Sequence, residues 1–83
     1  MAKIELYTAD WCGHCVRAKM LLQQRGLPFE EIHVDKQPGF REKLEELTGH
    51  WTVPQIVIDG RPIGGYAELH ELDVSGQLAS LAA

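Results

Sequence analysis

The fold of this chain is decided by the stretch Trp11-Cys12-Gly13-His14-Cys15, which contains its only two cysteines. The residues before it alternate as in a short β-strand: Ile4, Leu6, Tyr7 and Thr8. The apolar residues after it recur at helical spacing: Val16, Met20, Leu21 and Leu22. Gly26-Leu27-Pro28 then stops the helical run. Cys12 is therefore predicted near the N-cap of a helix, with Cys15 one turn later and within its reach.

The spacing of the two cysteines predicts redox chemistry. Unpaired N–H groups and the helix dipole at a helix N-terminus stabilise a thiolate over a thiol. We therefore predict that Cys12 is the nucleophile and that the more sheltered Cys15 resolves the mixed disulfide. The alternative is half of a zinc site, but His33, His50 and His70 are scattered without ligand spacing. We expect no metal and read these three histidines as surface or capping residues.

Length, charge and hydropathy limit the class of protein. The 83 residues suffice for one domain, spanning 1–83, with one hydrophobic core. A net charge of -4 argues against nucleic acid or an anionic membrane as partner, and no apolar run is long enough for a membrane span. Met1-Ala2-Lys3 leads into the first strand without a secretory leader, so we expect a cytoplasmic protein; a removed transit peptide is the alternative.

The middle of the chain predicts a βαβ unit followed by a second helix. Residues 29–34 alternate and predict a strand parallel to the first. Pro38-Gly39 opens a helix whose C-terminal cap is Gly49. The apolar residues of this helix fall on one face: Phe40, Leu44 and Leu47. With Tyr7, Phe29 and the leucines, they are predicted to form the core.

The last third predicts a hairpin followed by helix. Asp59-Gly60 joins two apolar runs, residues 53–58 and 61–63, which is a strong hairpin signal. Helical spacing resumes at Tyr66, is interrupted around 73–76, and ends in a segment predicted to fold back on the sheet through Val74, Leu78 and Leu81. The order βαβαββα predicts an α/β fold with a four-stranded mixed sheet flanked by helices.

Three segments together resemble a dithiol glutaredoxin of the bacterial type, with the thioredoxin fold, over essentially the whole chain. They are residues 8–19, 51–56 and 64–69. The resemblance implies a monomeric glutathione-dependent dithiol-disulfide oxidoreductase. Such an enzyme reduces disulfide-containing proteins and glutathione mixed disulfides, with glutathione as co-substrate.

The resemblance also implies a set of glutathione-binding residues: Thr52, Val53, Pro54, Gly65, Tyr66, Ala67 and Glu68. Pro54 would be cis, turning the Val53 N–H and C=O outward for pairing with an extended thiol peptide; a trans proline at the start of an edge strand is the alternative. The backbone of residues 66–68 would hold the γ-glutamyl carboxylate, and the Glu68 side chain the ammonium group. Gly64-Gly65 could instead serve turn geometry alone.

The active-site sequence departs from the family between the cysteines. Gly13-His14 replaces the common Pro-Tyr and resembles the active site of protein disulfide isomerase, although the rest of the chain does not. Trp11, Gly13 and His14 are therefore predicted to modulate the active site. A protonated His14 would favour the thiolate and make the disulfide more oxidising; an exposed histidine of little effect is the alternative.

The predicted glutathione site departs from the family as well. Glu68 stands where the family usually has Asp, and Ala9 and Trp51 stand where cations commonly hold the glycyl carboxylate. We therefore expect weaker glutathione binding, which Arg17 and Lys19 would offset unless they are simply solvated. Trp11 and Trp51 either line the groove beside Cys12 or pack against the core.

Two other activities fit parts of the sequence. One is a [2Fe–2S] carrier, in which Cys12 from each of two protomers and two glutathione thiols hold the cluster. Gly13 favours it, whereas the second cysteine is less typical. The other is a thioredoxin-like redoxin recycled by thioredoxin reductase, although such proteins usually have Trp-Ser-Gly-Phe where this chain has Gly64-Gly65-Tyr66-Ala67.

Overall fold

Four strands form one mixed sheet in a computed structural model that describes residues 2–10, 12–36, 38–50 and 52–81. The strands are β1 (Ile4–Thr8), β2 (Glu30–His33), β3 (Gln55–Ile58) and β4 (Arg61–Gly64). Their order across the sheet is β2-β1-β3-β4. β2 runs parallel to β1, and β3 is antiparallel to both β1 and β4. This confirms the predicted α/β fold with a mixed sheet.

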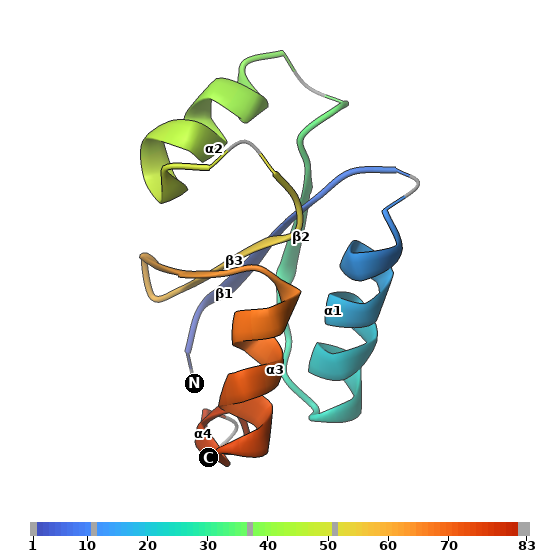
Figure 1. Ribbon diagram of the computed structural model, residues 1–83, viewed down its shortest axis with the longest axis vertical. Coiled ribbons are helices and arrows are strands. Elements are labelled where there is room, and N and C mark those ends of the chain that lie inside the picture. The colour runs from blue at the N-terminus through green and yellow to red at the C-terminus, as the bar shows by residue number, and fades with distance from the viewer. Residues whose placement is uncertain (1, 11, 37, 51, 82–83) are drawn as a thin grey trace.

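Helices cover both faces of the sheet. They are α1 (Gly13–Gln24), α2 (Phe40–Thr48), α3 (Tyr66–Val74) and the short α4 (Gln77–Ser80). Figure 1 shows α1 and α3 side by side, with α2 on the other side of the strands. Side-chain alternation along β1 explains this arrangement, because Leu6 and Tyr7 point to opposite faces.

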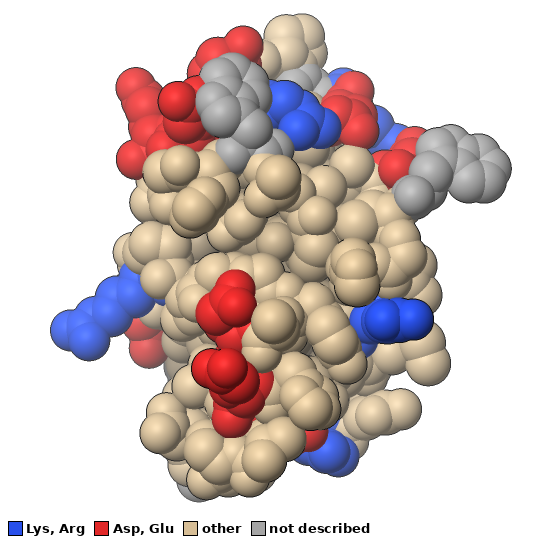
Figure 2. All heavy atoms as spheres, viewed as in Figure 1, with Lys and Arg blue, Asp and Glu red and all other residues tan. Residues whose placement is uncertain are grey.

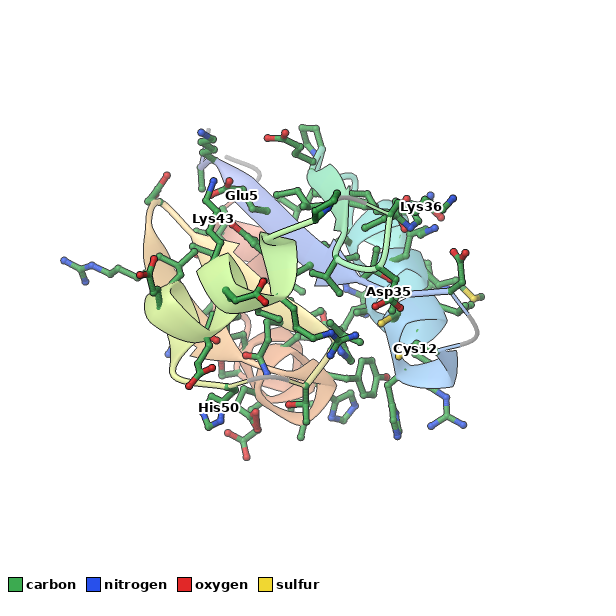
Figure 3. All side chains as sticks on the ribbon, turned by 90° about the horizontal axis from the view of Figure 1, so that it is seen from above. Glu5, Cys12, Asp35, Lys36, Lys43 and His50 are labelled. Carbon is green, nitrogen blue, oxygen red and sulfur yellow. The ribbon has the colours of Figure 1, made fainter. Side chains whose placement is uncertain are left out.

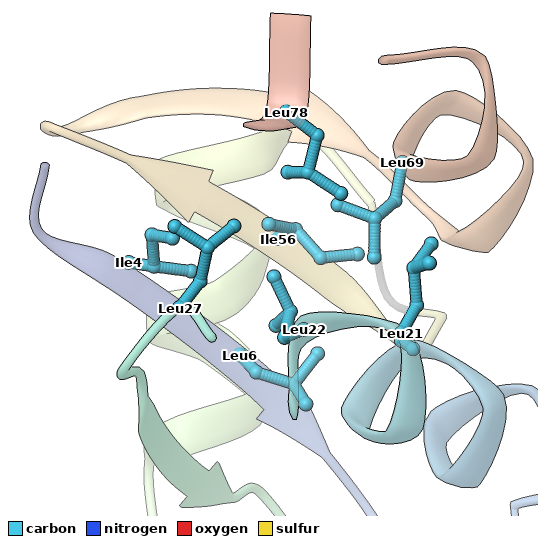
Figure 4. Packing of buried hydrophobic residues seen from close by; sticks show 9 residues of the cluster. Ile4, Leu6, Leu21, Leu22, Leu27, Ile56, Leu69 and Leu78 are labelled. Carbon is cyan, nitrogen blue, oxygen red and sulfur yellow. The ribbon is translucent and has the colours of Figure 1, made fainter. Parts of the chain in front are cut away.

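The sheet divides the predicted core into two clusters. The larger cluster joins Ile4 and Leu6 of β1 to Leu22, Leu69 and Leu78 of the helices (Figure 4). The smaller cluster packs α2 against the opposite face. Its buried members are Tyr7, Val34 and Leu44. Phe29 packs at the edge of the larger cluster, as expected, whereas the side chain of Phe40 lies outside what the structure describes.

Three of the apolar residues that indicated the helices are exposed, and one of them, Val74, was predicted to fold back on the sheet. Val16 and Met20 are 54% and 51% exposed, because α1 turns a different stripe toward the sheet. Its buried residues are Cys15, Ala18, Leu21 and Leu22. Val74 does not fold back on the sheet: it is 73% exposed at the end of α3, and Leu78 of α4 is fully buried instead. The helical spacing of apolar residues thus predicted where the helices lie, but not which of their apolar side chains are buried.

Strand direction places three connections at one end of the sheet. β1 ends at Thr8, and its neighbour β3 begins at Gln55, which pairs with Tyr7. β4 ends at Gly64, which pairs with Ile56 near the start of β3. The loops after β1, before β3 and after β4 therefore meet at this end.

The substitution Leu69→Ala is expected to lower the free energy of unfolding by about 2–5 kcal/mol, because it empties a fully buried position of the larger cluster. Val74→Ala in the same helix is the matched control. This substitution should change the free energy of unfolding by less than about 0.5 kcal/mol, since Val74 is exposed. Urea unfolding of both variants measures the difference. Equal losses would contradict the assignment of α3's buried face.

Candidate active site

Cys12 is the N-cap of α1, as the sequence predicts. Its backbone is extended, with φ -105° and ψ 108°, and its Sγ accepts a hydrogen bond from the Cys15 N–H at 3.2 Å. Figure 3 shows Cys12 at the start of this helix. An N–H donor aimed at sulfur at a helix N-terminus stabilises negative charge there. The local structure therefore suits Cys12 to act as a nucleophile.

Cys15 lies beneath Cys12 in the first turn of the helix. It is 2% exposed, and both cysteines are free thiols. Burial raises the pKa of the Cys15 thiol, with a further rise from its interaction with Cys12; Thr8 acts in the opposite direction. The two thiols are thus unequal: Cys12 is accessible, and Cys15 is sheltered and held in the protonated form at neutral pH.

The segment before β3 lies against Cys12. The Val53-Pro54 peptide bond is cis, as the family resemblance implied. The Cys12 thiol donates to the Val53 carbonyl with an Sγ–O distance of 3.7 Å. The structure therefore brings together the first and second of the three sequence motifs.

A cleft of about 400 Å³ joins the second motif to the third. All seven residues predicted to bind glutathione line it. Its other lining residues are His14, His50, Gln55 and Gly64. We call this the Pro54 cleft.

Glu68, which lines the Pro54 cleft, folds back on the start of its own helix. Its Oε1 accepts the Gly65 N–H at 2.9 Å. A Cβ at Gly64, whose φ is 117°, would lie 2.5 Å from the same oxygen, so this turn requires glycine. The first N–H groups of α3 have no acceptor within the helix and are available to a carboxylate.

His14 lies along the wall of the Pro54 cleft. Its imidazole stacks on the Tyr66 ring with centroids 6.2 Å apart and planes at 24°, and His70 lies 6.0 Å from the same ring. The residue between the two cysteines thus contacts the third motif, a link that sequence spacing does not show.

A second cleft of about 400 Å³ opens on the other side of Cys12. Several side chains there form ionic contacts. Lys19 pairs with Glu31 at 2.6 Å, and His33 lies between the carboxylates of Asp10 and Glu31 at 3.7 and 3.6 Å. Lys19 therefore belongs to this second cleft and is absent from the lining of the Pro54 cleft.

Sequence reasoning missed three residues that line the Pro54 cleft. His50, read as a surface residue, is exposed but faces this cleft, and Gln55 and Gly64 directly flank the predicted motifs. Their adjacency to Pro54 and Gly65 was the available signal. The predictions for Trp11 and Trp51 fall on positions outside the described residues.

The described residues contain neither a candidate metal site nor a helix that could span a membrane. Among them, no three His, Cys, Asp or Glu side chains are grouped so as to hold a metal ion. None of the helices, within the same residues, has the length and hydropathy to cross a membrane.

The fold and the site together define a class of protein: a thiol-disulfide oxidoreductase of the thioredoxin fold, with C-x-x-C opening the first helix opposite a cis proline. The glutaredoxin family model matches residues 4–63. The chain belongs to the glutaredoxin family. It is therefore a glutathione-dependent thiol-disulfide oxidoreductase.

Individual relatives agree with this assignment. The chain is 43% identical over 81 residues to a glutaredoxin from Pseudomonas aeruginosa, covering 98% of this chain and 96% of the relative. It is also 43% identical to glutaredoxin 3 from Escherichia coli, covering 98% of each. Its structure is similar to a buckwheat glutaredoxin–glutathione complex, with a TM-score of 0.87 and 29% identity over 95% of this chain and 74% of that one. These relatives do not favour the cluster-carrier or thioredoxin-like alternatives.

Iodoacetamide is expected to alkylate Cys12 of the reduced protein at least about tenfold faster than Cys15 at pH 7, because Cys15 is buried and burial raises the pKa of its thiol. Peptide mass spectrometry measures both rates. In Cys12→Ser, alkylation of Cys15 should rise only at a pH above the range of an ordinary thiol, since its pKa is raised. Unfolding in urea is the control and should restore ordinary behaviour. Equal labelling of both cysteines in the folded protein would contradict the asymmetry.

Proposed function

We propose that Cys12 attacks the disulfide of the substrate and that Cys15 resolves the product. The observation that carries this assignment is the position of the Cys12 Sγ, 3.2 Å from the Cys15 nitrogen and 3.7 Å from the Val53 oxygen. The Cys12 sulfur therefore lies at the N-terminus of α1 and faces Val53, whose backbone can pair with a substrate peptide.

The chemistry proceeds by two thiol–disulfide exchanges. The Cys12 thiolate forms a bond to one substrate sulfur, the substrate S–S bond breaks, and the other sulfur leaves as a thiolate that takes up a proton. Cys15 then loses its proton and attacks Cys12, which releases the second substrate thiol and leaves a Cys12–Cys15 disulfide. Two glutathione molecules return the two electrons and become oxidised glutathione. With a glutathione mixed disulfide, a second glutathione can replace Cys15.

Glutathione binds in the Pro54 cleft in this proposal. Backbone groups of Val53 pair with the glutathione peptide, and the N–H groups of Tyr66, Ala67 and Glu68 take the γ-glutamyl carboxylate. Thr52 and Gly65 complete the walls. The Glu68 carboxylate, one methylene farther from the backbone than Asp, reaches the ammonium group while remaining near the Gly65 N–H.

The biological setting follows from the same chemistry. We propose that residues 1–83 act as one glutaredoxin domain, as a monomer in the cytoplasm, where reduced glutathione supplies the electrons. Disulfide-containing proteins are the physiological substrates. No resident metal takes part.

Reduction of a small glutathione mixed disulfide, coupled to glutathione reductase and NADPH, tests the roles of the two cysteines. Cys12→Ser should lose all turnover above background, because no other thiol is accessible. Cys15→Ser should keep turnover on the mixed disulfide, since glutathione can resolve it, and lose most activity on a protein disulfide. A titration of free thiols confirms that each variant is intact. Activity in Cys12→Ser, or none in the wild type, would refute the proposal.

His14→Tyr is expected to make the active-site disulfide less oxidising. Loss of a charge interaction with the thiolate of about 0.5–1 kcal/mol corresponds to about 10–20 mV. Equilibration with glutathione redox buffers at pH 6 measures the potential. His70→Tyr is the matched control, because His70 also lies beside the Tyr66 ring but is not between the two cysteines. An unchanged potential in His14→Tyr would show that His14 has little effect on the thiolate.

A further inference from the structure

We propose that the second cleft holds the segment of a substrate protein that flanks its cysteine, and that Asp10 there favours a lysine or arginine in this segment. The inference rests on the proposed function, in that Cys12 is the nucleophile and glutathione occupies the Pro54 cleft. It assigns a surface to the other half of the mixed disulfide and a chemical preference to the protein that is reduced.

The two halves of a mixed disulfide between glutathione and a protein need separate surfaces. The α-carbons of two cysteines joined by a disulfide lie only about 4.4–6.8 Å apart. When glutathione fills the Pro54 cleft, the protein half therefore begins beside that cleft, near Cys12. Among the residues that the structure describes, Cys12 lines the second cleft but is absent from the lining of the Pro54 cleft. The second cleft, of about 400 Å³, is thus placed to receive the protein half.

The lining of the second cleft comes from three elements that meet beside Cys12. They are the end of β1 with the two residues after it, the first half of α1, and β2. Three of the lining residues have small or apolar side chains: Ala9, Gly13 and Val16. Val16 is 54% exposed, so a peptide segment that covers it removes apolar surface from water. The cleft therefore offers a peptide an apolar contact in addition to its charged groups.

Asp10 is the carboxylate of the second cleft that a substrate cation can reach. Glu31 already pairs with Lys19 at 2.6 Å. The Asp10 side chain is 54% exposed, and its neighbours His33 Nδ1 and Lys36 Nζ lie 3.7 and 3.9 Å from its Oδ1, beyond hydrogen-bond distance. Its oxygens can therefore accept charge-assisted hydrogen bonds from a lysine or arginine of the substrate.

The surroundings of this cleft are charged rather than apolar. Figure 2 shows charged side chains of both signs gathered at the end of the molecule where α2 and the connection after β2 lie. Lys36 of that connection reaches toward Asp10. A partner that covers this end must match individual charges, which favours selection by side-chain charge.

The chemistry of the substrate supplies the matching charge. The thiolate is the reactive form of a cysteine, and neighbouring lysine or arginine side chains lower the pKa of a thiol. Accessible cysteines of low pKa are the ones most susceptible to oxidation and to capping by glutathione. A glutathionylated cysteine therefore tends to have a cation beside it, which the Asp10 carboxylate attracts. The net charge of -4 of the chain acts in the same direction.

Turnover of two glutathionylated peptides, coupled to glutathione reductase and NADPH, tests the inference on the wild-type protein. The peptides are identical except that two lysines or two glutamates flank the cysteine. Each kcat/KM is divided by the rate of the same peptide with free glutathione, which corrects for the different leaving thiols. The corrected value should be about fivefold higher for the lysine peptide at low ionic strength, and the ratio should approach one in about 0.5 M salt.

Variants distinguish Asp10 from the net charge of the protein. Asp10→Asn should lower the ratio to about twofold or less, and Asp10→Lys should bring it below one. Glu71→Gln is the matched control, because it removes a negative charge from an exposed position outside the lining of both clefts, and it should keep the ratio. Since each ratio compares two peptides on one variant, a general loss of activity does not alter it.

The outcomes separate this inference from the proposed function. A wild-type ratio near one, or an unchanged ratio in Asp10→Lys, would overturn the inference. Equal changes in Asp10→Asn and Glu71→Gln would also overturn it, because net charge alone would then explain the preference. Absence of turnover by the wild type on both peptides, and on a small glutathione mixed disulfide, would instead overturn the proposed function.

Discussion

The contact between the Cys12 sulfur and the Val53 carbonyl, 3.7 Å apart, depends on the antiparallel pairing of β1 with β3. Residues 41 positions apart in the chain meet because one strand ends where the other begins. The same end of the sheet receives the turn after β4, which brings Gly64 and Gly65 beside Pro54. A shift of one residue in the β1–β3 register would turn Leu6 away from the helices and separate these loops. The active site is therefore a consequence of strand register.

The two cysteines differ in their accessibility and surroundings although they lie within one helical turn of each other. Cys12 occupies the N-cap, where its sulfur accepts an N–H and remains accessible to a substrate. Cys15 occupies the buried stripe of α1 that also contains Ala18 and Leu22, and burial raises its pKa. The same packing that fixes the helix on the sheet therefore favours the protonated form of the Cys15 thiol. Stability and redox asymmetry have one structural origin.

Charge is distributed unevenly between the two clefts that flank Cys12. In the second cleft, Lys19 is neutralised by Glu31, and His33 lies between two carboxylates. The Pro54 cleft has imidazoles, an inward-folded Glu68 and the free N–H groups of α3. Its capacity to attract an anion depends on the backbone N–H groups and the dipole at the N-terminus of α3. The two clefts beside Cys12 thus differ in the charge that they present to an anionic ligand.

The sequence by itself determined the order of elements, the N-cap position of Cys12 and the Asp59-Gly60 hairpin, because helical period, capping and turn preference act over a few residues. The resemblance in the Pro54 and Gly65 motifs also predicted the cis bond and the cleft-lining residues. Only the tertiary structure decided that Ala18 rather than Val16 faces the sheet, that Val74 is exposed, and that His50 joins His14 at one cleft. The stacking of His14 on Tyr66 likewise joins residues from two helices. These outcomes depend on how separate elements pack, and no local pattern along the chain encodes the relative rotation of two helices.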